Sequence, residues 1–266
     1  MTTPIYFFNK NKLDISNPNA ILTASQAQAY VDFVRNRKND SYWITTGSVD
    51  ADLTNIVFDF VDERDVDFIM LVNHNFKAYT VQYWDGAAYV NFSQVIAETV
   101  NTTDTTFHSF TKVATTKLKL IIQGTMILNA DKRMAQFIAS TEIGQLNDYP
   151  EIKAPAFDRN LARTEMLSGK NSLIENIGGF TVTLDKANWK TAADLAIVET
   201  LFFINNGFLV WLCGNDIQQF GASSLRGYRL QDIFLMKCSN DYSPEYMKGL
   251  IEQGIGITLK LVEVVD

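Results

Sequence analysis

Two tryptophans and a short polar run carry the residue types that a small ligand would meet. "NHN", residues 73–75, follows a nearly all-apolar stretch, which predicts a loop at the end of a strand. Trp84 stands next to a predicted turn at Asp85-Gly86, where a ring would lie at a rim. Stacking rings and hydrogen-bonding amides suit a sugar, so five residues are candidate ligand contacts: Trp43, Asn73, His74, Asn75 and Trp84. A solvated loop position is the alternative for His74, and a core position is the alternative for Trp43.

The strands around this turn have a second interpretation. In "FKAYTVQYWDGAAYVNF", residues 76–92, alternation places Tyr79, Val81 and Tyr83 on one face of a strand. Tyr89 and Phe92 are expected to rejoin this aromatic side after the turn. Strand pairs of this kind fill the inside of a β-sandwich, so core packing is the first interpretation of the rings and ligand contact is the second.

The sequence assembles no catalytic or metal-binding pattern. "LSGKNSLIE", residues 167–175, lacks the earlier glycine of a phosphate-binding loop, because Thr164 stands in its place. No serine lies in a Gly-x-Ser-x-Gly elbow, and two histidines leave few candidates for a general base. The carboxylates of "DFVDERDVD", residues 59–67, indicate a solvated charged turn without the ligand spacing of a calcium loop. The chain is therefore expected to be no enzyme and to need no cofactor and no metal.

The bulk composition is that of an ordinary globular chain. Of 266 residues, 47% are hydrophobic and 20% are charged, and the formal net charge is −7. An acidic surface repels phosphate, which disfavours nucleic acid as a partner. No apolar run reaches the roughly 18–20 residues that span a bilayer, and the start of the chain lacks a signal-peptide pattern. We therefore expect synthesis in a cytoplasm and no membrane insertion.

Periodicity predicts a chain that is mainly β with some α. The predicted parts are an N-terminal segment (1–40), an antiparallel β-sandwich (41–130), a linker (131–160) and an α+β domain with a mostly antiparallel sheet (161–266). The first part is expected to hold a helix at about 24–37, with Thr23 and Gln26 as a capping box. Pro150 and Pro155, without a sustained period around them, mark the linker.

The first block of strands resembles a discoidin-type (galactose-binding-like) jelly roll. The likeness lies in an early tryptophan, an apolar-Phe-Asp-Phe strand, an asparagine at a strand end and a Tyr-x-Val-x-Tyr-x-Asp-Gly run, represented here by Trp43, Phe58-Asp59-Phe60, Asn73, Tyr79 to Tyr83, Asp85-Gly86 and Tyr89. It covers about a third of the chain. The disulfide of many extracellular members is missing, which argues against an extracellular lectin. The resemblance implies a jelly roll whose end loops are suited to a glycan.

The C-terminal half resembles tail or baseplate proteins of tailed bacteriophages. The likeness lies in Gly227-Tyr228-Arg229, Asp232-Ile233, Tyr242-Ser243-Pro244 and a final strand that ends in Val-Glu-Val. It implies a ring-forming β-domain with the jelly roll appended, similar to distal tail proteins between tail tube and baseplate. Proteins of that family are made in the host cytoplasm, act in the tail of the virion and have no active site.

Two functions follow from these patterns. The first is a structural component of a phage tail or baseplate, which assembles into a ring with copies of itself and neighbouring tail proteins. The alternative is a carbohydrate-binding module whose partner is a glycan, such as one on the host surface. Its contacts would come from loops around Tyr42-Trp43, Asn73 to Asn75 and Asn101 to His108.

Overall fold

The computed structural model consists of two compact units, Lys10–Glu142 and a second made of Met1–Asn9 with Ile143–Asp266. It describes residues 5–38, 41–146, 151–165, 171–189, 192–205, 207–211, 233–242, 245–246 and 255–264. The described residues lie mostly in antiparallel strands, with one short helix in each unit, which confirms the predicted fold class of mainly β with some α. Within these ranges, no helix combines the length and the apolar character needed to cross a membrane.

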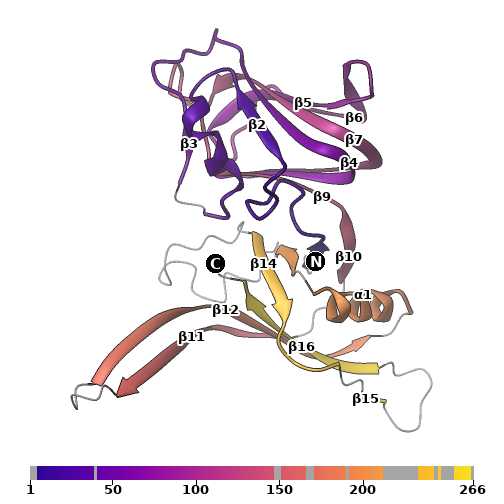
Figure 1. Ribbon diagram of the computed structural model, residues 1–266. Coiled ribbons are helices and arrows are strands. Elements are labelled where there is room, and N and C mark those ends of the chain that lie inside the picture. The colour runs from indigo at the N-terminus through magenta and orange to yellow at the C-terminus, as the bar shows by residue number, and fades with distance from the viewer. Residues whose placement is uncertain are drawn as a thin grey trace. The chain divides into compact units, whose positions relative to one another are not determined.

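The unit Lys10–Glu142, called the N-terminal unit below, is a β-sandwich (Figure 1). Its larger sheet has the order β2-β4-β7-β5-β6, with β9 also paired to β4, and β3 and β8 form a two-stranded sheet. The elements are β2 (Ile21–Ala24), the 3-10 helix η1 (Gln28–Arg35), β3 (Trp43–Ile44), β4 (Thr54–Val72), β5 (Phe76–Trp84), β6 (Tyr89–Glu98), β7 (Thr106–Thr125), β8 (Arg133–Met134) and β9 (Gln136–Ser140).

The long strands β4 and β7 take part in both layers of the sandwich. The first half of β4 pairs with β2 and with the end of β7, whereas its second half pairs with β9 and with the start of β7. Between the halves the register shifts from Asp59 to Arg64, and Val61 has a left-handed φ of 69°. Such bulges let a strand pass from one layer to the other. The charged run 59–67 is therefore a bulged part of a strand, which corrects the predicted turn.

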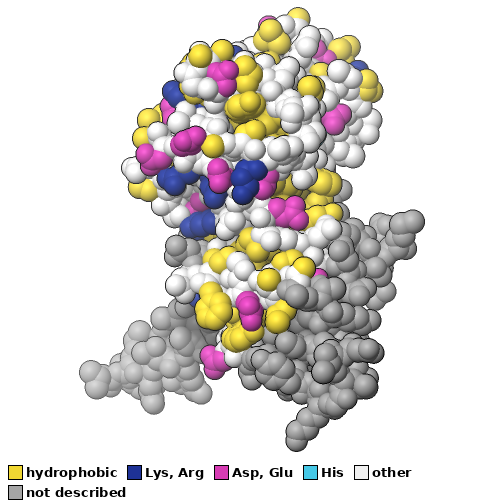
Figure 2. Space-filling model, turned by 90° about the vertical axis from the view of Figure 1, so that its right-hand side faces the viewer, with side chains coloured by type: hydrophobic (Ala, Val, Ile, Leu, Met, Phe, Trp, Pro, Cys, Tyr) yellow, Lys and Arg dark blue, Asp and Glu magenta, His cyan; other side chains and the backbone are white. Residues whose placement is uncertain are grey.

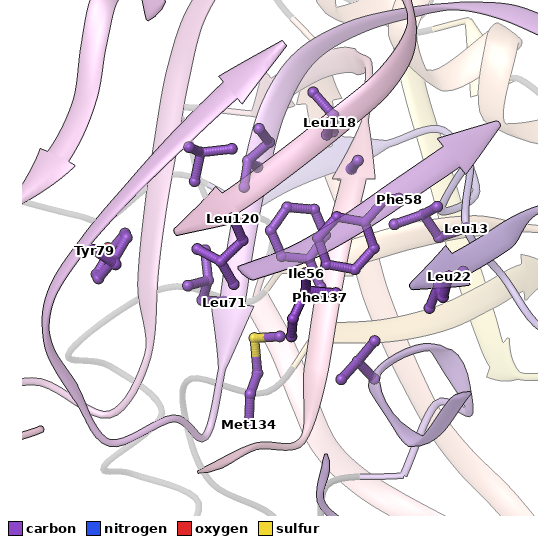
Figure 3. Close-up of a cluster of buried hydrophobic side chains, with 14 of the residues drawn as sticks. Leu13, Leu22, Ile56, Phe58, Leu71, Tyr79, Leu118, Leu120, Met134 and Phe137 are labelled. Carbon is purple, nitrogen blue, oxygen red and sulfur yellow. The ribbon is translucent and has the colours of Figure 1, made fainter. Parts of the chain in front are cut away.

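The core of the N-terminal unit lies between these layers. Phe58 of β4 stacks on Phe137 of β9 with ring centroids 4.0 Å apart and an interplanar angle of 15° (Figure 3). Tyr79 and Val81 of β5 belong to the same cluster, as the alternation predicts. Burying a large apolar side chain contributes about 1.5–3 kcal/mol, so each face-to-face contact of this kind is a substantial share of the stability.

The helix near the N-terminus is shorter than predicted and begins differently. β2 occupies Ile21–Ala24, and η1 follows only at Gln28–Arg35, so the expected helix over 24–37 is wrong in type and in start. The residue before η1, Ala27, has a left-handed φ of 51°, and no side chain caps it. Instead, the Gln28 side chain reaches back, accepts from the Ala24 N–H at 2.5 Å and donates to the Leu22 carbonyl at 3.0 Å. The glutamine thus bonds to the backbone of β2, which competes with a capping box.

The second unit, called the C-terminal unit, is built on one sheet with the order β10-β1-β13-β14-β16-β12-β11, and β15 pairs with β16. Its elements are β1 (Ile5–Phe8), β10 (Glu142–Leu146), β11 (Glu151–Glu165), β12 (Asn171–Trp189), α1 (Ala192–Phe203), β13 (Phe208–Trp211), β14 (Ile233–Cys238), β15 (Glu245–Tyr246) and β16 (Ile255–Glu263). Val198 and Leu201 of α1 pack with Phe7, Phe208 and Leu259 of the sheet. A mostly antiparallel α+β arrangement therefore accompanies the sandwich.

The predicted part boundaries differ from the divisions in the structure. β1 pairs with β13, so the first residues belong to the C-terminal unit although the sequence places them in a segment 1–40. The range 131–160, predicted as a linker, holds β8, β9 and β10 and the start of β11. Pro155 falls within β11 and is therefore a weak marker of a linker, whereas Pro150 lies outside the described residues.

Charges of both signs are mixed on the face shown in Figure 2. Lys and Arg side chains alternate with Asp and Glu on the N-terminal unit in this view. Lys12 interacts electrostatically with charges of both signs, namely those of Arg64, Asp65, Asp67 and Lys112. On the part of the N-terminal unit seen in this view, the negative charge is thus not gathered into one acidic field.

Candidate functional site

Trp43 lies inside the N-terminal unit. Its side chain is 0% exposed and belongs to the core cluster, and its indole N–H donates to the Gln26 carbonyl at 3.2 Å. A ring that stacks on a sugar must offer a free face, and this ring offers none. The prediction of Trp43 as a ligand contact is corrected to a core position.

His74 is also part of the interior. It is 1% exposed, its Nδ1 accepts the Phe76 N–H at 3.1 Å, and its Nε2 lies 3.1 Å from the Thr106 hydroxyl. Burial lowers the pKa of His74 to about 3, with Asp104 raising it and His108 lowering it further. The ring is therefore neutral near pH 7 and has a structural role, which corrects both the predicted ligand contact and its solvated alternative.

Asn75 holds two loops together through both atoms of its carboxamide. Its Nδ2 donates to the Asp131 carbonyl at 2.8 Å, and its Oδ1 accepts the Arg133 N–H at 2.9 Å. The backbone adds a bond from the Asn75 N–H to the Arg133 carbonyl at 3.2 Å. Since its polar atoms are used in this way, Asn75 positions Arg133 and is not itself free to take a sugar hydroxyl.

Asn73 turns the chain at the end of β4 and contacts Tyr42. It is half-buried with a left-handed φ of 49°, a conformation that asparagine tolerates better than most residues. Its backbone N–H donates to the Thr105 hydroxyl at 3.3 Å, and its side-chain amide donates to the Tyr42 hydroxyl. The amide is thereby directed at a ring that lies just before the buried Trp43.

An exposed arginine completes this arrangement. The guanidinium carbon of Arg133 lies over the Tyr42 ring, 5.3 Å from its centroid, and Tyr42 is half-buried. Three segments far apart in sequence thus bring together an aromatic ring, a planar charged donor and a carboxamide. We call Tyr42, Asn73, Asn75 and Arg133 the loop-end cluster. Arg133 was missed from the sequence because it lies in the range taken for a linker.

The neighbouring loop, residues 101–105, is fixed by its own side chains. Asn101 is 8% exposed, and its Nδ2 donates to the Phe76 carbonyl at 2.9 Å and to the Thr103 carbonyl at 2.6 Å. The His74 N–H donates to the Asp104 carbonyl at 2.7 Å, which ties this loop to the turn after β4. Hydrogen bonds therefore hold the loop beside the loop-end cluster in place.

Trp84 lies at the other end of β5 from the asparagines. β5 runs from Phe76 to Trp84, and a strand rises about 3.3 Å per residue, so the two ends are about 26 Å apart. Trp84 is partly exposed, and its ring contacts Tyr89 with centroids 5.2 Å apart at 67°. The structure therefore separates Trp84 from Asn73, His74 and Asn75, with which it was expected to form one site.

Within the described residues, no group of three or more histidines, cysteines or carboxylates could hold a metal ion. The carboxylates of β4 have other contacts. Asp59 pairs with Lys117 at 2.8 Å, and the carboxylate of Asp67 accepts the Glu142 N–H at 2.8 Å. These groups stabilise the strand and its bulge, and they do not converge on one point.

Several solved structures of carbohydrate-binding proteins are similar to this chain. A chitosan-binding module of a chitosanase/glucanase from Paenibacillus sp. IK-5 is 15% identical, with a TM-score of 0.41 over 49% of this chain and 98% of that one. CpGH89CBM32-6 of Clostridium perfringens is 10% identical, with a TM-score of 0.41 over 50% and 99%. CpGH89CBM32-5 of Clostridium perfringens, solved with GalNAc-β-1,3-galactose, is 14% identical, with a TM-score of 0.39 over 46% and 96%.

At these values of identity and TM-score, the likenesses carry no argument about a ligand of this chain. No model of a known protein family matches the sequence, and no curated protein matches it either.

Proposed function

We propose that the N-terminal unit is a carbohydrate-binding module in which Tyr42, Asn73 and Arg133 of the loop-end cluster contact the sugar and Asn75 positions Arg133. The observation that carries the proposal is the meeting of Tyr42, Arg133 and Asn73 at one end of the sandwich. An aromatic ring suits the C–H face of a pyranose, and a guanidinium and a carboxamide suit its hydroxyls. Binding without catalysis is part of this proposal, because His74 and His108 both have pKa values lowered by burial and contact other side chains of the unit.

Order in the loops supports the proposal, because groups held in place lose little entropy on binding. Asn75 fixes the backbone of Arg133 through both its N–H and its carbonyl, and Asn101 fixes the neighbouring loop. The ring, the guanidinium and the amide thus need little rearrangement to meet a ligand.

The test is a glycan array with the full chain, followed by calorimetry on each saccharide that binds. Tyr42→Ala and Arg133→Gln should each weaken binding at least tenfold, because each removes a direct contact. Tyr30→Ala is the matched control, since Tyr30 is 51% exposed on the same unit but lies in η1. The proposal fails if no saccharide binds, or if Tyr42→Ala binds as tightly as the unchanged protein.

A second function, assembly in a phage tail or baseplate, rests on the C-terminal unit. β11 stands at the end of its sheet, and no described strand pairs with its outer edge. An open edge offers backbone N–H and C=O groups to another chain, which suits a ring of copies or contact with neighbouring tail proteins in a virion. Negative-stain electron microscopy of the purified protein tests this role. Rings with a fixed number of subunits support it, and compact monomers at every concentration, alone and with candidate neighbours, refute it.

A further inference from the structure

The outer face of the larger sheet in the N-terminal unit carries a second set of ligand-type groups. Inward residues of β5 and β7, such as Val81 and Leu120, lie in the core, so their neighbours along each strand point outward. On this outer side β5 presents Gln82 and Trp84. The adjoining strands place Tyr89, Asn91 and Lys119 beside them. We call these five residues the sheet-face patch.

Its aromatic part is a ring pair across a hairpin. Trp84 and Tyr89 stand directly opposite each other in the register of β5 and β6, and both are partly exposed. The four-residue turn between them is fixed by Asp85, whose Oδ1 accepts the N–H groups of Ala87 and Ala88, each at 2.8 Å. Gly86 has a φ of 103°, which few other residues adopt. The ring pair is therefore held in place from one end.

The polar part has unused hydrogen-bonding capacity. Gln82 donates to the Asn91 Oδ1 at 3.1 Å, a bond that leaves the Gln82 oxygen and the Asn91 amide group available. Lys119 pairs with Gln82 in the β5–β7 register, and its ammonium lies 5.3 Å from the centroid of the Tyr89 ring. Among the described residues, no carboxylate lies within ion-pair distance of Lys119. The nearby Lys117, in contrast, is neutralised by Asp59 at 2.8 Å.

A cation that has no described carboxylate within ion-pair distance and lies beside partly exposed rings suits a ligand that is both flat-faced and anionic. The chain has a formal net charge of −7, so the positive charge of Lys119 runs against the trend of the whole molecule. A sugar with a carboxylate can contact every group of the patch. Its C–H face can pack on the rings, its carboxylate can pair with the ammonium, and its hydroxyls can bond to the two amides.

We propose that the sheet-face patch binds an acidic saccharide of the uronic-acid type. The proposal shares with the proposed function the idea of a carbohydrate ligand, but it uses different residues, at the opposite end of β5 from Asn73 and Asn75. It is therefore open to a separate test.

The test measures binding of an oligogalacturonate to the full chain by calorimetry, with its methyl ester as the neutral counterpart. The unchanged protein should bind the acid at least tenfold more tightly than the ester, and the difference should shrink as salt is added. Lys119→Gln should weaken binding of the acid by roughly tenfold and leave the ester unaffected. Trp84→Ala should weaken both, while Lys77→Gln, an exposed lysine at the start of β5, should change neither.

The outcomes separate this proposal from the previous one. The sheet-face proposal is overturned if the acid does not bind. It is also overturned if Lys77→Gln weakens binding of the acid as much as Lys119→Gln does, which would indicate general charge attraction. A loss in Tyr42→Ala but not in Trp84→Ala places the ligand at the loop-end cluster and overturns only the sheet-face site. If light scattering detects a dimer that Trp84→Ala converts to monomers, the patch is an interface with a second copy, and this result also overturns the proposal. Because Trp84→Ala removes a cross-strand contact, the surface variant Lys119→Gln decides the matter if that protein does not fold.

Discussion

Acid should destabilise the N-terminal unit through one buried histidine. His74 is 1% exposed, and its Nδ1 must stay unprotonated to accept the Phe76 N–H at 3.1 Å. Burial lowers the pKa of His74 to about 3. The nearby His108 also lowers this pKa, whereas Asp104 raises it. In the unfolded chain the same side chain has a pKa of about 6.5.

The sign and size follow from the difference between these two pKa values. Because the pKa of His74 is lower in the folded state, its contribution is fully present above pH 6.5 and is lost as the pH falls from about 6.5 towards 3. Each pH unit in this window costs about 1.4 kcal/mol, so the loss between pH 7 and pH 5 is about 2 kcal/mol. Burial also lowers the pKa of His108, which adds to the loss, while the raised pKa values of Asp67 and Glu142 act in the opposite direction.

A comparison with His74→Gln isolates the histidine from these other groups. Glutamine does not titrate, and its side-chain oxygen can replace Nδ1 as acceptor for the Phe76 N–H. Hydrogen exchange of β5 and β7, measured by mass spectrometry at pH 7, 6 and 5 and corrected for the intrinsic rates, gives the opening free energy of this unit. The unchanged protein should lose about 2 kcal/mol more than the variant between pH 7 and pH 5.

An NMR titration provides the direct check, since the chain has two histidines. The reasoning is refuted if the His74 ring titrates near pH 6.5 in the folded protein, or if the variant and the unchanged protein show the same dependence on pH.

Three further outcomes are expected. Trp43→Ala should destabilise the N-terminal unit by roughly 3–5 kcal/mol in urea unfolding, because it empties a fully buried site; a small loss together with lost sugar binding would contradict the core position. Burial raises the pKa of Asp14, but the bonds from Arg37 and Ser16 lower it to about 2. The stability that the Asp14 carboxylate contributes is therefore present above pH 3.8 and is lost as the pH falls towards 2. Asp14→Asn should cost roughly 2 kcal/mol at pH 7, and urea midpoints equal to those of the unchanged protein would argue against the pair. Burial raises the pKa of Cys238 to about 12, so peptide mapping should find its alkylation at pH 8 roughly a thousandfold slower than that of a free cysteine; fast labelling of the folded chain would disprove its burial.

Local patterns were enough to predict the strands and much of what they bury. Alternation in residues 76–84 places Tyr79 and Val81 inside, and the structure agrees, because a period of two depends only on the backbone. The same reasoning failed one turn later. Tyr89 was expected on the side of Tyr79, but the register of the hairpin sets it opposite Trp84, which faces outward. The number of residues in the turn decides which face the returning strand presents, and alternation within one strand does not contain that number.

Contacts between distant segments lay beyond the sequence altogether. Arg133 acquires its place from Asn75, 58 residues earlier, and no period in either segment indicates the other. β1 pairs with β13 across some two hundred residues, so the unit boundaries also depend on pairings that a local reading does not reach. The polar residue types near the loop end were recognised, but which of them are free and which are used internally depends on hydrogen bonds such as those of Asn75.

The distance between the two candidate sites determines what a single ligand can do. β5 runs from Phe76, which follows Asn75, to Trp84, so the sites are about 26 Å apart along a strand paired on both sides. A disaccharide cannot reach from one to the other, and short saccharides should therefore bind with independent affinities at each site. A long acidic polysaccharide that carries the sugars preferred by both sites should bind more tightly than either site alone, because the second contact becomes intramolecular. Calorimetry with short and long ligands measures this gain, and Lys119→Gln should reduce it roughly tenfold while the loop-end affinity for short neutral sugars stays unchanged. An equal gain in Lys119→Gln would mean that the two sites do not bind the same polysaccharide molecule.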